Sequence, residues 1–116
     1  MVPKFIIVHH SFTPKDVPAN SAENSFNTTH RDRGFPKSAL GWWIGYHYVI
    51  YGDGQLRQYR RDDETGAHTK EQSMNFQSLG ICLSGNFDSE LPNQVQVDAL
   101  KQAVIQKRET LTKKAA

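Results

Sequence analysis

This 116-residue sequence contains a single cysteine, has no long apolar run and carries little net charge. Its single cysteine, Cys82, excludes an intramolecular disulfide, so the fold does not depend on an oxidising compartment. No run of 18 apolar residues is present, and we expect no membrane span. The first apolar segment, residues 5–8, is too short for a signal peptide, which predicts synthesis in the cytoplasm.

Basic clusters and C-terminal histidines are also scarce. The net charge is +2, and the two densest basic spots, Arg60-Arg61 and Lys113-Lys114, are not interleaved with aromatic residues. We interpret both as solvated surface charge and expect no nucleic-acid partner. All five histidines lie at or before His68, and the last 48 residues contain none. Any histidine ligands of a metal must therefore come from the first part of the chain.

Strand patterns dominate the first two thirds of the sequence. Residues 5–10 are nearly continuous in apolar and β-branched side chains, which predicts a strand buried on both faces. Residues 45–51 and 55–60 flank Gly52-Asp53-Gly54 and predict a β-hairpin. Residues 78–84 predict a further buried strand, and the segment before it, residues 61–77, is expected to be irregular.

Two helices are expected beside these strands. Ser21 as N-cap and Gly34 as a stop signal predict a helix over residues 22–33. Pro92 suits a first-turn position, and apolar residues three and four apart predict a long helix from there to about residue 114. The chain is thus predicted to form one α+β domain, residues 1–116, with a central mixed sheet of about four strands flanked by helices.

Residues capable of chemistry occur at or near the predicted strand ends. Taken singly, each of them is more often structural than functional. A histidine that ends a strand usually lies at the rim of a sheet, and neighbouring residues of a strand point to opposite faces, so His9 and His10 are expected to point apart. The candidates are His9-His10, Tyr46-His47 and His68 with Thr69.

In their order and flanking residues, these segments resemble the type 2 N-acetylmuramoyl-L-alanine amidases. That family includes phage lysozyme-type amidases and animal peptidoglycan recognition proteins. The resemblance covers residues 5 to about 105. It is carried by the strand ending in His9, by 45–50 with its Asp-Gly turn, by 66–69, and by Asn75 with 78–85. It implies the fold of that family.

The resemblance also implies a role for each matching residue. His9 stands where the family's first zinc ligand lies, and Tyr46 stands where active members have a catalytic tyrosine. His47, His68 and Thr69 match positions lining the groove that holds the stem peptide. The implied reaction is hydrolysis of the amide between N-acetylmuramic acid and L-alanine in peptidoglycan. A zinc ion would activate water, and a phenol could donate to the developing oxyanion.

The chain departs from the family's pattern after the long helix. The family takes two further zinc ligands, a histidine and a cysteine or aspartate, from a later segment, and none follows Glu109 here. We therefore expect the fold to be truncated at its C-terminus, and a missing last strand would leave a sheet edge open to self-association.

Three hypotheses follow from this departure. The chain is a truncated amidase, such as an endolysin of phage or bacterial origin that reaches the wall after release. Alternatively, it is a metal-free module that binds peptidoglycan without cutting it. In the third hypothesis, His9, His47 and His68 form a different metal site.

Overall fold

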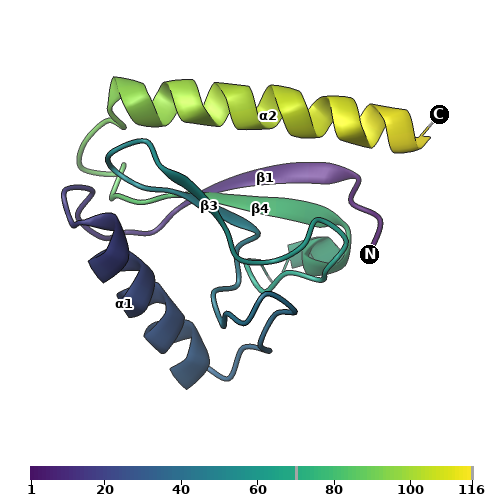
Figure 1. Cartoon of the computed structure of the whole chain (residues 1–116), viewed down its shortest axis with the longest axis horizontal. Coiled ribbons are helices and arrows are strands. Elements are labelled where there is room, and N and C mark those ends of the chain that lie inside the picture. Colours follow the sequence, from purple (N-terminus) through teal and green to yellow (C-terminus); the bar gives the residue numbers. More distant parts are fainter. Residues whose placement is uncertain (70, 116) are drawn as a thin grey trace.

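The computed structural model describes residues 1–69 and 71–115, and its centre is a four-stranded mixed sheet (Figure 1). The strands, in the spatial order β1-β4-β2-β3, are Phe5–His10 (β1), Ser78–Leu83 (β4), Tyr48–Ile50 (β2) and Leu56–Gln58 (β3). β1 and β2 both run parallel to β4, whereas β3 is antiparallel to β2. The predicted α+β class with a mixed sheet is confirmed.

Two α-helices flank the sheet on opposite faces (Figure 1). They are Ala19–Asp32 (α1) and Gln94–Ala115 (α2), and a short 3-10 helix, Glu71–Phe76 (η1), interrupts the segment that was predicted to be irregular. Alternate residues of β4 supply two cores: Cys82 packs on the α1 side, and Ile81 packs on the α2 side with Ala103. No helix among the described residues is long and apolar enough to cross a membrane.

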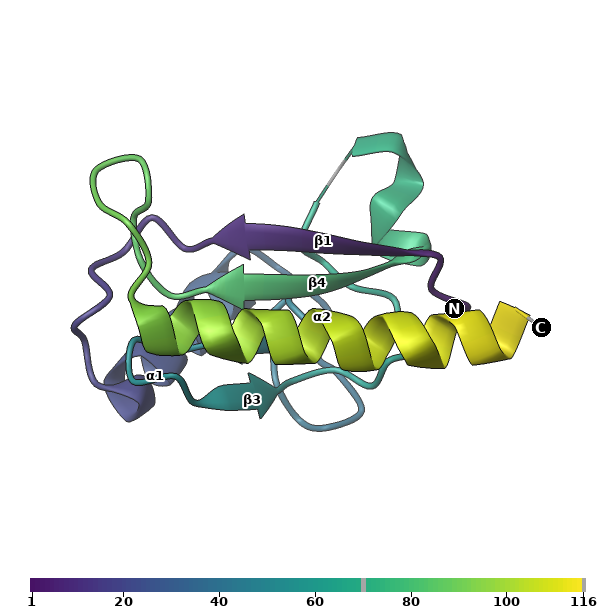
Figure 2. The same ribbon diagram turned by 90° about the horizontal axis from the view of Figure 1, so that it is seen from above.

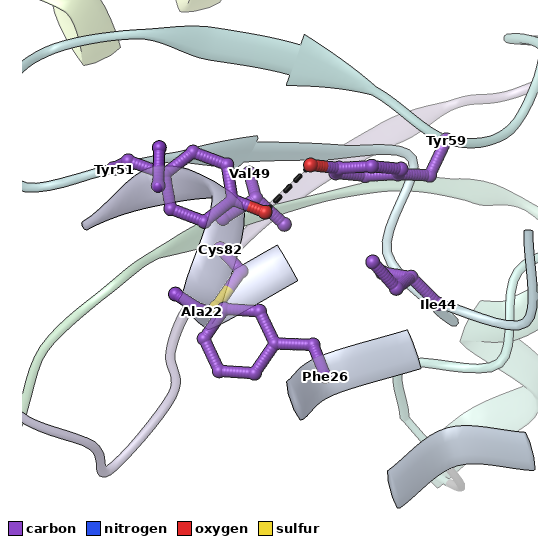
Figure 3. Packing of buried hydrophobic residues seen from close by; sticks show 8 residues of the cluster. Ala22, Phe26, Ile44, Val49, Tyr51, Tyr59 and Cys82 are labelled. Atoms are coloured by element: carbon purple, nitrogen blue, oxygen red, sulfur yellow. Dashed lines mark hydrogen bonds between the residues drawn. The ribbon is translucent and has the colours of Figure 1, made fainter. Parts of the chain in front are cut away.

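Aromatic residues dominate the core beneath α1 (Figure 3). The hydroxyls of Tyr51 and Tyr59 lie 2.5 Å apart, and Tyr59 donates to Glu23 Oε2 at 2.6 Å. Because the Tyr59 hydroxyl donates its hydrogen bond to the carboxylate, Tyr51 must be the donor between the two tyrosines. Arg57 also donates to Glu23 at 3.0 Å. These bonds tie α1 to the β2–β3 hairpin.

The helix starts differ from the sequence prediction. α1 begins at Ala19 with Pro18 as N-cap, so the prediction of Ser21 as its cap was wrong. The physical reason is a buried stripe at helical spacing that extends back to Ala19 and includes Ala22. α2 begins after Asn93 rather than at the predicted Pro92.

A reciprocal cap fixes the start of α2. The N–H of Gln96 donates to Asn93 Oδ1 at 2.9 Å, and the N–H of Asn93 donates to Gln96 Oε1 at 3.3 Å.

The turn between β2 and β3 contains Asp53 and Gly54. Gly54 adopts φ +88°, so this turn has the left-handed backbone that glycine favours. The hairpin strands are three residues each, shorter than predicted.

Two predictions about burial were wrong. Within residues 1–69 and 71–115, β1 is an edge strand that pairs with β4, and its Phe5 and Val8 are 48% and 46% exposed rather than buried. A continuous apolar run does not distinguish a central strand from an edge strand, because the order of strands in a sheet depends on which other segments pair with it. In the Arg60-Arg61 pair, Arg61 is exposed as predicted, but Arg60 is only 2% exposed.

Candidate functional site

A cleft of about 330 Å³ lies on the α1 side of the sheet. Its walls come from the end of α1, from the residues before β2 and from the segment before β4. They are formed by His30, Arg33, Phe35, Tyr46, Ala67, His68, Thr69 and Asn75. Three of the five predicted site residues, Tyr46, His68 and Thr69, therefore line one cleft.

His9 joins this group from the end of β1. Its ring centroid lies 5.5 Å from that of Tyr46 and 5.0 Å from that of His68. His10 lies elsewhere, as expected from strand alternation: its ring contacts Phe12 and Phe87, and its Nδ1 accepts the N–H of Phe87 at 3.0 Å. The chain thus places one of its two adjacent histidines against Tyr46 and His68, which line the cleft.

A directed hydrogen-bond chain holds His9 and His68. Ser78 Oγ donates to Met74 O at 2.6 Å, so its oxygen accepts from His68 Nε2 at 3.2 Å. His68 Nδ1 is then an acceptor, and the Nε2–H of His9 donates a hydrogen bond to it at 2.8 Å. This assignment makes the His68 ring neutral. Because burial lowers the pKa of His9, its ring is also neutral at neutral pH, and Nδ1 is its unprotonated nitrogen. The orientation of His9 therefore depends on His68.

Asn75 fixes the backbone of the same wall. Its Oδ1 accepts the N–H groups of His68 at 2.9 Å and of Thr69 at 3.0 Å. One side-chain oxygen therefore positions two of the three residues that the resemblance assigns to substrate binding. This supports a positioning role for Asn75.

His47 is not on the cleft surface, although the resemblance assigns it to the groove. It is fully buried, its Nδ1 accepts the N–H of Gly80 at 3.0 Å, and its Nε2 donates to Glu64 O at 2.7 Å. Both ring nitrogens are thus used inside the protein. The ring packs edge-on against His68 at 5.7 Å, so the geometry makes His47 a support for His68 rather than a residue that touches substrate.

Two glycines make room for the His68 ring. A Cβ atom built on Gly80 would lie 2.5 Å from the His68 ring, and one built on Gly66 would also lie 2.5 Å from it. Gly80 is in the buried strand β4, where a glycine often marks the close approach of another group. A glycine inside the predicted buried strand 78–84 is the sequence signal that indicates this close approach.

Five cleft residues were not among the predicted site residues: Ala67 and Asn75, which lie in or near the matching segments, and His30, Arg33 and Phe35, which do not. His30 belongs to the buried stripe of α1, and its Nδ1 accepts the N–H of Gly45 at 2.8 Å. Helical spacing from Phe26 would have placed His30 on the inner face of the helix. Arg33 and Phe35 follow the helix and gave no periodic signal.

Burial holds the cleft histidines neutral. It lowers the pKa of His30 to about 4, with smaller contributions from the charges of Arg33 and Arg60. Burial likewise lowers the pKa of His68 to about 4, assisted by His9 and His47. Burial raises the pKa of Tyr46, so its phenol stays protonated at neutral pH and can donate a hydrogen bond.

Stability is expected to fall on acidification because of His30. The unfolded chain binds a proton at this group near pH 6.5, whereas the folded chain binds it only near pH 4. The contribution is thus fully present above pH 6.5 and is lost as the pH falls towards 4, by about 3 kcal/mol. Urea unfolding from pH 4 to 7 should show a shallower pH slope for His30→Asn, which keeps an acceptor for Gly45. An unchanged slope would contradict this assignment.

The described residues do not fit a zinc ion. No group of three or more His, Cys, Asp or Glu able to hold a metal occurs among them, which contradicts the hypothesis of a site made by His9, His47 and His68. Cys82 lies opposite His9 in the β1–β4 register, but it is fully buried, and burial raises its pKa to about 12. A neutral buried thiol is a poor metal ligand.

The sheet and its histidine-lined and tyrosine-lined cleft define an α+β domain of the amidase and peptidoglycan-recognition type. A family model described as N-acetylmuramoyl-L-alanine amidase matches residues 1–114, and the chain belongs to this family. The N-acetylmuramoyl-L-alanine amidase of Sus scrofa is 31% identical over 98 residues, which are 84% of this chain and 16% of that protein.

Solved structures show the same relationship. Bumblebee PGRP-SA superposes with a TM-score of 0.76 at 26% identity, covering 94% of this chain and 62% of that one. A Drosophila PGRP-LB mutant in complex with tracheal cytotoxin gives a TM-score of 0.70 at 28% identity, covering 90% of this chain and 61% of that one. The chain therefore spans less than two thirds of the length of each of these proteins.

Proposed function

We propose that this chain binds peptidoglycan at the junction of N-acetylmuramic acid and the stem peptide and acts in hydrolysis of the amide to L-alanine. The observation that carries this proposal is the convergence of His9, Tyr46 and His68 at one cleft in a member of the amidase family. The tracheal cytotoxin complex of the similar PGRP-LB structure supports a peptidoglycan fragment as the ligand.

The cleft side chains suit such a ligand. Phe35 and Tyr46 offer apolar surface to the flat faces of a sugar or peptide, and Arg33 places a cation beside them for a carboxylate of the stem peptide. The neutral phenol of Tyr46 can donate to the oxygen of the scissile carbonyl as negative charge develops there. Overall, water adds to the carbonyl carbon, the C–N bond breaks, and the amine of L-alanine leaves with a proton.

Zinc is the metal expected from the family, but the described residues do not bring three ligands together. His9 would be one ligand, through the nitrogen that His68 leaves unprotonated. The similarity to peptidoglycan-recognition proteins supports a second candidate function, a module that binds peptidoglycan without hydrolysis. The two functions share the cleft and differ in the product.

One experiment separates these functions. The purified chain is mixed with a soluble muramyl tripeptide, with and without added zinc; calorimetry measures binding and mass spectrometry measures release of the peptide. Binding with release supports the amidase, and binding without release at any zinc concentration supports the binding module. A chain that does not bind the tripeptide would refute both.

Tyr46→Phe is expected to separate binding from catalysis. It removes only the hydroxyl, so the affinity for the tripeptide should stay within about threefold, whereas the hydrolysis rate should fall by about 10²- to 10³-fold. The ratio of the two effects is the relevant measurement. If hydrolysis by the variant matched that of the parent chain, Tyr46 would have no part in the reaction.

A further inference from the structure

The face of β4 on the α1 side begins with a serine next to His68. Ser78, Gly80 and Cys82 share this face, because alternate residues of a strand point the same way. Gly80 has no side chain, and the His68 ring occupies the space above it. η1 leads directly into the start of β4 (Figure 2), and Ser78 Oγ donates to the carbonyl oxygen of Met74 in that helix at 2.6 Å. Ser78 thus stands between the His68 ring and a backbone carbonyl.

The hydroxyl of Ser78 has one proton and two neighbours that could accept it. Met74 O lies 2.6 Å from Oγ, a usual distance for an O–H···O bond, whereas His68 Nε2 lies 3.2 Å away. The proton therefore belongs to the bond with the carbonyl, and Oγ presents lone pairs to the ring. The backbone of Ser78 forms a further hydrogen bond that favours a proton on His68. His68 Nε2 is therefore the protonated nitrogen of its ring.

The His68 ring is held against turning over, which would exchange its two nitrogens. Turning over would place ring carbons against His9 Nε2 and Ser78 Oγ, which lie 2.8 Å and 3.2 Å from the ring nitrogens, and both hydrogen bonds would be lost. The backbones of Gly66 and Gly80 also enclose the ring, since a Cβ atom on either would lie 2.5 Å from it. With the ring held, the proton on Nε2 leaves Nδ1 as the acceptor for His9.

We propose that Ser78 is a positioning residue that selects, through His68, which ring nitrogen of His9 carries the proton. In this arrangement His9 holds its proton at Nε2, and its lone pair is at Nδ1. In the reversed arrangement, His68 would donate from Nδ1 to His9 Nε2. The lone pair of His68 Nε2 would then oppose those of Ser78 Oγ, or it would take the hydroxyl proton away from Met74. Either change loses a hydrogen bond, so the serine favours the first arrangement.

The consequence for binding rests on the proposed function, in which His9 contacts the ligand. A peptidoglycan fragment carries amide N–H and hydroxyl groups that donate hydrogen bonds. Such a donor finds a lone pair at His9 Nδ1 in the first arrangement and a proton there in the reversed one. Ser78 is fully buried and is not among the described residues that line the cleft. It would therefore act on the ligand through His68 and His9.

The parent chain tests the assignment without a substitution. Proton–nitrogen correlation spectra of the imidazole rings at neutral pH distinguish a protonated nitrogen from an unprotonated one. We expect His9 and His68 to be protonated at Nε2 and unprotonated at Nδ1. A parent chain that carries the His9 proton at Nδ1 would overturn the proposal.

Ser78→Ala removes the hydroxyl, and Ser84→Ala is the matched control. Both serines are fully buried, and Ser84 directly follows β4, but Ser84 Oγ has no hydrogen-bond partner within residues 1–69 and 71–115. Ser78→Ala should shift the tautomer ratio of His9 towards Nδ1–H by about fivefold, the effect of one hydrogen bond, and Ser84→Ala should leave it unchanged. Circular dichroism checks that both variants are folded. A folded Ser78→Ala with the ratio of the parent chain would refute the role of the serine.

The soluble muramyl tripeptide tests the link to binding. In Ser78→Ala, saturating tripeptide should return the His9 ratio towards that of the parent chain, because a ligand that binds one form increases its population. Calorimetry should show an affinity lower by no more than about twofold, since only the fraction of competent rings is reduced. A ratio that does not move at saturation would overturn the role of His9 Nδ1 in binding. If the parent chain does not bind the tripeptide, the proposed function fails, while the spectra of the free chain still decide whether Ser78 sets the tautomer.

Discussion

Replacing Arg60 with methionine is expected to lower the free energy of unfolding by about 3 kcal/mol or more. The guanidinium is buried and donates to three backbone carbonyls, those of Ile44 at 2.9 Å, Thr65 at 3.3 Å and Pro36 at 2.6 Å. Without the donors, each buried acceptor loses its partner at a cost of about 1–3 kcal/mol. Typical domains are stable by only about 5–15 kcal/mol, so the loss is large.

The neighbouring residue provides a matched control. Arg61 is exposed, and Arg61→Met should change the unfolding free energy by less than about 0.5 kcal/mol. Arg60→Lys keeps the charge but has no fork of donors, so its loss should lie between those of the other two variants. Urea unfolding of the three variants gives the comparison. Equal midpoints for Arg60→Met and Arg61→Met would show that the three carbonyls do not depend on the guanidinium.

Arg60 also illustrates which part of the structure the sequence could not predict. As a residue in a basic pair it was interpreted as surface charge, since charge patterns describe neighbours in sequence. Its burial depends on three carbonyls brought together from residues 36, 44 and 65. The burial of His47 likewise depends on residues distant in sequence, because its two ring nitrogens form hydrogen bonds with the backbone of Gly80 and Glu64.

Elements with strong local patterns were predicted well. Residues 5–10 form the expected strand, β4 is fully buried, and the last helix extends to the end of the described chain. Strand alternation alone predicted that the side chains of His9 and His10 point to opposite faces of the sheet. The exposure of β1 could not be predicted from its own residues, because a strand's position in the sheet depends on which segments pair with it. The resemblance to amidases predicted Tyr46 and His68 at the cleft but gave no information on how His68 is supported.

That support leads to the second large effect. Gly80→Ala is expected to destabilise the protein by about 1–3 kcal/mol and to weaken binding of the muramyl tripeptide at least about tenfold. The new Cβ would meet the His68 ring at 2.5 Å. The ring is also held by His9 and Ser78, so it cannot move without breaking those bonds. Urea unfolding and calorimetry measure the two effects.

A double-mutant cycle identifies the cause. In a His68→Ala background the ring is absent, so adding Gly80→Ala should cost less than about 0.5 kcal/mol of stability and should not weaken binding further. His68→Ala alone should weaken binding, since it removes a cleft wall and the partner that orients His9. Equal costs of Gly80→Ala in both backgrounds would contradict the clash and assign the effect to the β4 backbone. A strong coupling would instead show that a glycine inside a buried strand sets the position of a cleft histidine, and through it that of His9.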